Sequence, residues 1–399
     1  IADSNFGMYK EDIDTCNALS DTIDEFSWPE YINVATGKNS KERVLEASRI
    51  VKGAMRLSGS VQSLDPDVLE NIKRKNISAE GLMELGLGAA DAGANSYSEI
   101  ILALPGDSLE AHYKTIQTIM DGGFNNLYLF QLMILQGTEL ATSEVIKKYK
   151  MDIRSRILPR CFGVYELLSE KIVAAEVDDI CVSNSTLNFD DYLKCRKFHL
   201  IVTIFYNDGV FGTILKFLKM IGVSVFQWMK ILDAAIPNER LAALFNDFIE
   251  ETRTELWQDR AELEAFVSEP ENVEQYVSGE LGKNLLFVFK TIAITQCTSE
   301  LAELAHETLA DLLSKTGKGT PENLEFVSDA LMYHRLQLEN IFFRQDEINH
   351  GCFHYDIRAF DQAESPGCLT EFQLSKERHY QFLMDDEQKD LVRRYIEIY

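Results

Sequence analysis

A short apolar run that ends in Leu-Pro-Gly gives the first indication of a binding site. Residues 101–103 are apolar, Leu104-Pro105-Gly106 follows them, and Asp107 with Glu110 has the spacing of a capping box at a helix start. A strand that enters a helix through such a turn presents backbone N–H groups at its carboxyl end. Ligands bind at this end of the strands in βα barrels. The stretch therefore predicts a ligand-binding turn.

Polar residues also stand at the ends of the other strands predicted in the first 140 residues. These ends carry Asp3 and Asn5, Lys38 and Asn39, Gln62 and Ser63, Pro105 and Gly106, and Gln131. One rim lined with polar groups from every strand is typical of a barrel, because the carboxyl ends of its parallel strands meet at one face. A doubly wound sheet also fits the order of elements, but the recurring polar ends favour the barrel.

Helices of ordinary length separate these strand ends. Apolar residues at helical spacing predict helices over about 11–26, from Ser40, from Asp65, over 78–92 and from the Leu-Pro-Gly turn to Gly122-Gly123. Strands are predicted near 31–35, 55–61, 98–102 and 127–133. Elements that alternate in this way form a parallel sheet with right-handed crossovers. We therefore predict an α/β domain over residues 1–141.

The pattern changes after this domain. Mainly helical sequence follows, with a short strand at 180–183 and a more strand-like tail from His350. The stretch 200–232 is strongly apolar, but polar and charged residues interrupt it, so no run of about 18 apolar residues remains. We therefore predict a mainly α-helical C-terminal region over 142–399 and no membrane span.

The acidic composition argues against some classes of partner. The chain has 64 Asp and Glu but only 39 Lys and Arg, which gives a formal net charge of −25. A surface that binds nucleic acid or anionic membranes needs clustered Lys and Arg. We therefore expect no nucleic-acid partner. The seven cysteines are scattered and include no Cys-x-x-Cys pair, which indicates a reducing, cytoplasmic compartment.

Taken together, the motifs in the first third of the chain resemble those of the radical SAM superfamily. They resemble in particular the branch whose members often carry an upstream cobalamin-binding domain. The stretches that carry the resemblance are residues 2–8, 38–39, 60–64, 72–76, 104–106 and 137–140. Each motif is common by itself, but all of them occur in the family's order and approximate spacing.

The resemblance implies a partial (β/α)6 TIM-like barrel whose first strand is missing from this chain. S-adenosylmethionine (SAM) and a [4Fe-4S] cluster would lie at the carboxyl ends of its strands. The residues that match the family's SAM-binding positions are Asp3, Asn5, Lys38, Gln62, Ser63, Leu104, Pro105, Gly106 and Gln131. By this resemblance, residues 3 and 5 meet the amino group of SAM, residues 62–63 its ribose and carboxylate, and residues 104–106 its adenine. Lys38 would face a carboxylate.

The sequence departs from the family at the cluster motif. The family holds its cluster with three cysteines, C-x3-C-x2-C, after the first strand, and this sequence has no such motif. Its expected position lies upstream of Ile1, and the chain begins within a strand, so we expect a fragment with its cluster ligands upstream. The chain as given would then hold no cluster and be inactive.

The whole protein would cleave SAM reductively at the cluster. Radical chemistry or methyl transfer on an unknown small molecule would follow, with an electron donor as partner, and the use of cobalamin stays open. Alternatively, the chain is a degenerate barrel that binds a small molecule or a protein without turnover. In that case Asp3 and Asn5 would form hydrogen bonds with the backbone of their own turn. Gln62 and Ser63 would cap the helix at Asp65, and Lys38 would be a surface lysine.

Two further kinds of site are less well supported. His350, Cys352 and His354 would share one face of a strand, and Cys368 could be a fourth zinc ligand. Structural zinc sites usually show paired ligands at characteristic spacings, so a half-buried strand is favoured and no metal ligand is assigned. No histidine has a triad-like context, and no carboxylate pair suggests an ordinary TIM-barrel acid–base enzyme. The catalytic residues stay unknown.

Overall fold

The computed structural model describes residues 1–37, 40–74, 78–91, 93–235, 238–342, 348–386 and 388–389. The chain forms two compact units, which we describe separately. The first contains Ile1–His199 and Ile249–Leu285, and the second contains Leu200–Phe248 and Leu286–Tyr399. The domain division after residue 141 stays a prediction.

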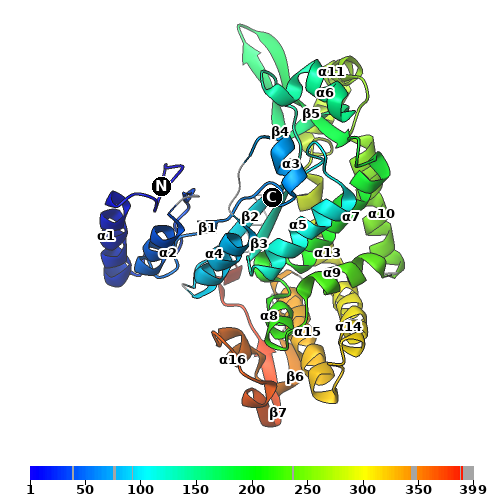
Figure 1. Ribbon diagram of the computed structural model, residues 1–399. Helices are drawn as coiled ribbons and strands as arrows, with labels where there is room; N and C mark the ends of the chain where they lie inside the picture. The colour runs from blue at the N-terminus through cyan, green and yellow to red at the C-terminus, as the bar shows by residue number, and fades with distance from the viewer. Residues whose placement is uncertain are drawn as a thin grey trace. The chain divides into compact units, whose positions relative to one another are not determined.

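A three-stranded parallel sheet forms the centre of the first unit (Figure 1). Its strands are β1 (Leu57–Ser58), β2 (Ser96–Leu102) and β3 (Asn126–Gln131), in the order β1-β2-β3. Single parallel bridges join Phe6 to Thr36, Ile32 to Met55 and Gln62 to Ile100. Parallel neighbours therefore follow one another in chain order. The fold is α/β as predicted, but among the described residues the sheet does not close, so a partial barrel is not confirmed.

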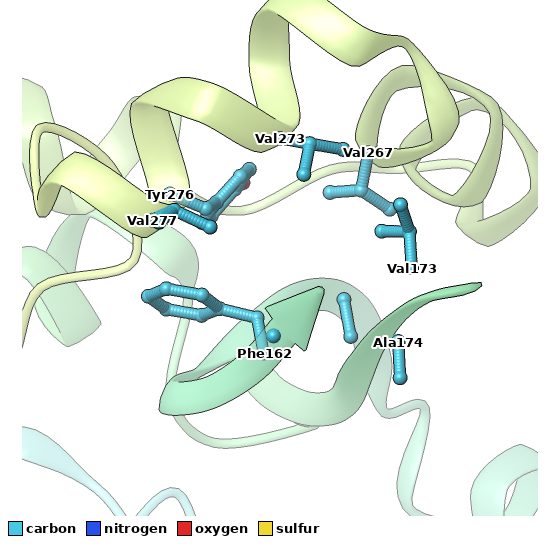
Figure 2. Close-up of a pocket in the computed structure, with 9 residues that line it drawn as sticks. Phe162, Val173, Ala174, Val267, Val273, Tyr276 and Val277 are labelled. Carbon is cyan, nitrogen blue, oxygen red and sulfur yellow. The ribbon is translucent and has the colours of Figure 1, made fainter. Parts of the chain in front are cut away.

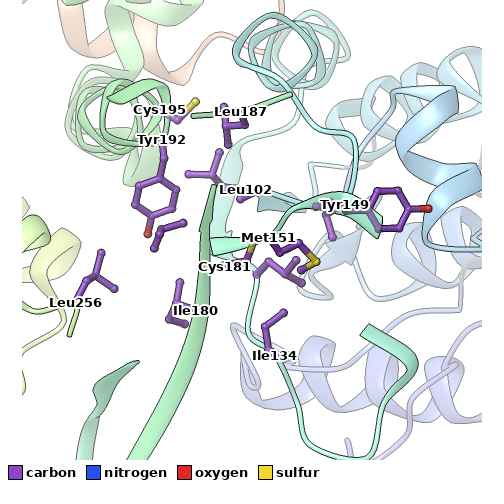
Figure 3. Packing of buried hydrophobic residues seen from close by; sticks show 14 of the residues in the cluster. Leu102, Ile134, Tyr149, Met151, Ile180, Cys181, Leu187, Tyr192, Cys195 and Leu256 are labelled. Atoms are coloured by element: carbon purple, nitrogen blue, oxygen red, sulfur yellow. The ribbon is translucent and has the colours of Figure 1, made fainter. Parts of the chain in front are cut away.

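The helices before and between these strands agree closely with the sequence pattern. They are α1 (Glu11–Phe26), α2 (Lys41–Ile50), α3 (Pro66–Asn71), α4 (Ala79–Asp91) and α5 (Leu109–Asp121). Buried and half-buried residues alternate along β2, and both α4 and α5 contact this strand. The buried face of β2 carries Ile100 and Leu102, and Leu102 belongs to the cluster of apolar side chains in Figure 3.

A long antiparallel hairpin lies within the mainly helical region predicted after residue 141. Strands β4 (Asp152–Leu167) and β5 (Glu170–Ser183) pair along nearly their whole length, where only a short strand at 180–183 was expected. Leu168 and Ser169 form the two-residue turn with φ of 50° and 70°. Such turns favour Asn-Gly, and Leu-Ser gives no such signal in the sequence.

The rest of the first unit consists of helices around this hairpin. They are α6 (Ser143–Tyr149), α7 (Phe189–Phe205), α11 (Arg260–Ser268) and α12 (Pro270–Ser278), with the short 3₁₀ turn η1 (Glu139–Ala141). The last residues of α7 belong to the second unit. The last residues of β5 also join the segment directly after β3, because Cys181 N–H donates to Leu132 O (2.9 Å) and Ile134 N–H to Asp179 O (2.7 Å).

The second unit is mainly helical. Its elements are η2 (Asn207–Gly209), α8 (Gly212–Met220), α9 (Val225–Ala234), α10 (Glu239–Thr254), α13 (Leu285–Gln296), α14 (Thr298–Lys315), α15 (Pro321–Phe342), β6 (Asn349–Tyr355), α16 (Ile357–Gln362), η3 (Leu369–Glu371) and β7 (Gln373–Phe382). The last residues of α10 belong to the first unit. Strands β6 and β7 pair antiparallel, as the strand-like tail suggested. Side chains of the apolar stretch 200–232, such as Phe217 and Trp228, are fully buried.

No single helix in the described part of the chain is both long and apolar enough to cross a membrane. Within those residues, only α13 and α14 together meet the length and composition expected of a span, and they meet at 92°.

Candidate functional site

The Leu-Pro-Gly turn has the tight geometry that its sequence suggests. Leu104 and Pro105 are buried directly after the end of β2. Gly106 has a φ of +88°, a conformation that residues with a side chain rarely adopt. A Cβ atom at Gly106 would lie 2.5 Å from Nδ2 of Asn71, at the end of α3. The backbone conformation therefore favours glycine here, and any Cβ atom would also force the Asn71 side chain to shift.

Side chains from distant segments hold the carbonyl groups of this turn. Leu104 O accepts hydrogen bonds from Asn184 Nδ2 (2.9 Å) and from the N–H of Asp107 (2.9 Å). Pro105 O accepts one from Asn71 Nδ2 (3.0 Å), and Asn71 Oδ1 in turn accepts one from the hydroxyl of Tyr149 (3.0 Å). The shape of the turn is thus fixed by α3, by α6 and by the loop after β5.

The helix after the turn begins one residue later than predicted. Ser108 is the N-cap of α5, and its Oγ accepts a hydrogen bond from the N–H of Ala111 (3.1 Å). Asp107 is 1% exposed, and its carboxylate accepts hydrogen bonds from the N–H groups of Ala103 (3.3 Å) and Ser108 (3.0 Å). The predicted capping box is therefore wrong, because the Asp107 side chain turns back toward the strand.

Gln62 lies beside β2, at the level of Ile100. Its N–H donates to Glu99 O (2.9 Å), and its carbonyl accepts from the N–H of Ile101 (2.9 Å). Its side-chain Oε1 accepts a hydrogen bond from Arg74 Nη1 (2.8 Å). This contact places the amide group of Gln62 next to the segment that follows α3.

Ser63 is buried next to Gln62 and serves the start of α3. Its Oγ accepts a hydrogen bond from the N–H of Asp65 (3.2 Å). Asp65 itself is the N-cap, because Oδ1 of Asp65 accepts from the N–H groups of Asp67 and Val68, both at 3.0 Å. The helix-start role considered for Ser63 is thus present in this structure.

Gln131 lies on the other side of β2, directly opposite Leu102 in the strand register. Its Oε1 accepts a hydrogen bond from the hydroxyl of Tyr192, on α7. Burial raises the pKa of Tyr192, so its phenol stays protonated and remains a donor. Gln62, residues 104–106 and Gln131 therefore gather around the carboxyl end of β2.

The remaining predicted residues are not brought to this group by any described contact. Asp3 and Asn5 are exposed, and the Asn5 N–H donates to Asp3 Oδ1 (2.7 Å), which is a local turn. Asn5 Nδ2 also lies near Ser4 Oγ (3.3 Å). Lys38 lies outside the described residues.

The cysteines of the described residues do not fit a [4Fe-4S] cluster. A cluster needs three thiolates close together, and no three His, Cys, Asp or Glu side chains among the described residues could hold a metal ion. Burial raises the pKa of Cys16 to about 11 and that of Cys181 to about 12, which keeps both as neutral thiols.

Alkylation should distinguish these buried thiols from an exposed one. A pKa of about 12 leaves a thiolate fraction of about 10⁻⁴ for Cys181 at pH 8, so iodoacetamide should modify Cys16 and Cys181 at least about a hundredfold more slowly than exposed Cys368. Peptide mapping by mass spectrometry of the native protein measures the three rates. Equal rates would contradict the burial of both thiols.

The residues considered as zinc ligands in the tail lie on a half-buried strand, which is the interpretation that the sequence favoured. His350, Cys352 and His354 lie on the more exposed face of β6, while Phe353 is buried on the other face. Cys352 Sγ donates to Glu377 Oε2 (3.2 Å), which raises the pKa of the thiol. Cys368 interacts instead with Thr370, at 2.9 Å.

The structure also contains contacts between polar residues that the sequence did not show. Asp107, His112 and His199 are buried close together, and Asn184 and Tyr192 contact two of the predicted positions. Between 61 and 87 residues separate the partners in three of these contacts, so no local spacing pattern could show them.

A small hollow in the first unit is lined by apolar side chains. It lies between the β4–β5 hairpin and helices α11 and α12, and apolar side chains such as Phe162, Val173, Val267 and Tyr276 line it (Figure 2). None of its lining residues is one of the predicted SAM-binding residues. It offers no polar group suited to chemistry.

No protein-family model matches the chain. Two curated proteins are similar to it. The 2-(S-pantetheinyl)-carbapenam-3-carboxylate methyltransferase of Streptantibioticus cattleyicolor is 31% identical over 211 residues, which is 52% of this chain and 30% of that protein. The cobalamin-dependent radical SAM methyltransferase TokK of Streptomyces tokunonensis is 34% identical over 153 residues, which is 37% of this chain and 22% of that protein.

The aligned part of the chain thus spans less than a third of the length of either relative. The strand-end motifs and the similarity to these two relatives nevertheless indicate the same kind of protein. The chain resembles radical SAM methyltransferases.

Proposed function

We propose that this chain binds SAM at the carboxyl ends of its parallel strands and serves methyl transfer to a small molecule. The observation that carries the proposal is the gathering of Gln62, residues 104–106 and Gln131 around the end of β2, in a chain similar to two methyltransferases. SAM supplies a methyl group on a positively charged sulfur when it is bound.

The described contacts suggest how each group would bind SAM. The Oε1 atoms of Gln62 and Gln131 already accept hydrogen bonds from Arg74 and Tyr192, so their amide N–H₂ groups would donate to hydroxyl or carboxylate oxygens of the ligand. The backbone of residues 104–106 would border the adenine. Ser63 would lie near the ribose, and Asp3, Asn5 and Lys38 would contact the amino-acid part.

The proposal extends to the fold and to the cofactors of the whole protein. We propose a partial (β/α)6 barrel, because parallel neighbours that follow one another in chain order differ from the reversed order of a doubly wound sheet. Cobalamin and a [4Fe-4S] cluster are included on the support of the relative named as cobalamin-dependent, and no described residue is assigned to either. An electron donor, a small-molecule substrate and a cytoplasmic location complete the proposal.

Equilibrium dialysis of the chain with radiolabelled SAM tests the proposal. We expect saturable binding that unlabelled S-adenosylhomocysteine displaces and free methionine does not. Gln131→Ala should weaken binding about fivefold, because a hydrogen bond contributes about 1 kcal/mol. Gln275→Ala, at an exposed position of α12, should bind as the unchanged chain does. Failure of the unchanged chain to bind SAM would refute the proposal.

A binding module without turnover is the second candidate. It is favoured by one observation, that both glutamine side chains at the rim have protein partners, as residues with a purely structural role would. This candidate predicts that Gln131→Ala lowers stability while leaving any affinity for SAM unchanged.

A further inference from the structure

Three buried side chains form a chain of contacts beneath the Leu-Pro-Gly turn. Asp107, His112 and His199 are 1%, 3% and 0% exposed. Nδ1 of His112 lies 3.4 Å from Oδ2 of Asp107, and Nε2 of His112 lies 2.8 Å from Nε2 of His199. The contacts connect the first turn of α5 to α7, which is 87 residues further along the chain.

The protonation pattern of this group follows from its contacts. A carboxylate only accepts hydrogen bonds, so the nitrogen of His112 that faces Asp107 carries a proton. A contact of 2.8 Å between two ring nitrogens needs one proton between them. Burial, followed by the nearby charges of His112 and Arg196, lowers the pKa of His199 well below its ordinary value, so His199 stays neutral.

Asp107 connects this group of side chains to the backbone of the turn. The oxygen that faces His112 also accepts a hydrogen bond from the N–H of Ala103 (3.3 Å). Ala103 has a φ of +68°, a conformation that alanine rarely adopts and that persists only when its surroundings impose it. The residue directly before Leu104-Pro105-Gly106 is therefore strained, and Asp107 is hydrogen-bonded to it.

We propose that Asp107, His112 and His199 are positioning residues that hold Ala103 in its left-handed conformation and so fix the shape of the turn at 104–106. The part of this inference that concerns SAM rests on the proposed function. The part that concerns the turn does not, since it depends only on contacts within the chain. No capping box or catalytic triad is involved, because none of the three side chains is exposed to a ligand.

Asp107→Asn tests the role of these three side chains with almost no change in the shape of the side chain at residue 107. The amide nitrogen of the new side chain cannot accept a hydrogen bond, so its one oxygen can serve either Ser108, as Oδ1 of the carboxylate does, or Ala103 and His112, as Oδ2 does, but not both sides. We expect amide hydrogen exchange at residues 103–106 to become at least tenfold faster. The ¹⁵N spectrum should also show that His112 no longer carries its proton on Nδ1. Glu110→Gln is the matched control, since it removes an exposed charge from the same helix turn.

A second variant covers the case in which Asp107→Asn does not fold. His199→Phe keeps a ring of similar size but removes the nitrogen that contacts His112, and it should also accelerate exchange at 103–106. His199→Gln, which restores a polar group, should recover part of the protection. Unchanged exchange at 103–106 in a folded variant of either residue would overturn the inference.

The affinity for SAM separates this inference from the proposed function. If the unchanged chain binds SAM, Asp107→Asn should bind it at least about tenfold more weakly, and Glu110→Gln should bind it normally. If the unchanged chain does not bind SAM, the proposed function fails, while the exchange and ¹⁵N measurements still decide whether the three residues hold the turn.

Discussion

Gly106→Ala is expected to destabilise the first unit and to abolish most of the proposed binding of SAM. Alanine at a φ of +88° costs about 1–2 kcal/mol by itself. Its Cβ would also lie 2.5 Å from Nδ2 of Asn71, which must then move away from Pro105 O and from the Tyr149 hydroxyl. Each of these two lost hydrogen bonds adds about 1 kcal/mol, so we expect a total near 3 kcal/mol. Equilibrium unfolding in urea and dialysis with SAM measure the two effects.

Gly93→Ala is the matched control for the backbone strain. Gly93 also has a positive φ, of +65°, but nothing lies within 4 Å of the position of its Cβ. This variant should therefore lose only the cost of the left-handed conformation, about 1–2 kcal/mol, and keep its affinity for SAM. If the two variants lost equal stability, the contact between Asn71 and the turn would contribute nothing, and our account of Gly106 would be wrong.

The parts of the fold that could be predicted depend on short sequence distances. α1 was predicted over about 11–26 because its apolar residues repeat at helical spacing, and the structure has Glu11–Phe26. The positions of Gln62 and Gln131 on either side of β2 follow from strand–helix alternation, since consecutive parallel strands become neighbours. Local periodicity and chain order were sufficient for these elements.

The parts that could not be predicted depend on contacts that no local pattern encodes. The β4–β5 hairpin turns at Leu168-Ser169, which is not a typical turn sequence, and the end of β4 exposes apolar residues such as Val164 and Leu167. Asp107 looked like a helix cap because its spacing to Glu110 is right. In the structure, the Asp107 carboxylate faces His112 instead of capping the helix. A single sequence shows the spacing but not the distant partner.

Asn184→Ala is the second change with a large expected effect, because one buried side chain serves two segments. Nδ2 of Asn184 donates to Leu104 O (2.9 Å), while Oδ1 accepts from the N–H groups of Thr186 (2.8 Å) and Leu187 (3.0 Å). Leu187 is fully buried, so its N–H would lose its partner in an apolar environment. Each buried group left unpaired costs about 1–3 kcal/mol, and we expect a loss near 4 kcal/mol.

Asn188→Ala separates this effect from the loss of an ordinary asparagine at a helix start. Asn188 is exposed, and its Oδ1 accepts from the N–H of Asp191 (2.9 Å), so this variant should lose about 1 kcal/mol. Urea unfolding measures both losses, and hydrogen exchange at 103–106 shows whether they reach the turn. Faster exchange in Asn184→Ala alone would mean that the loop after β5 holds the Leu-Pro-Gly turn in place. Equal losses in the two variants would instead leave α3, α6 and the group around Asp107 as the supports of the turn.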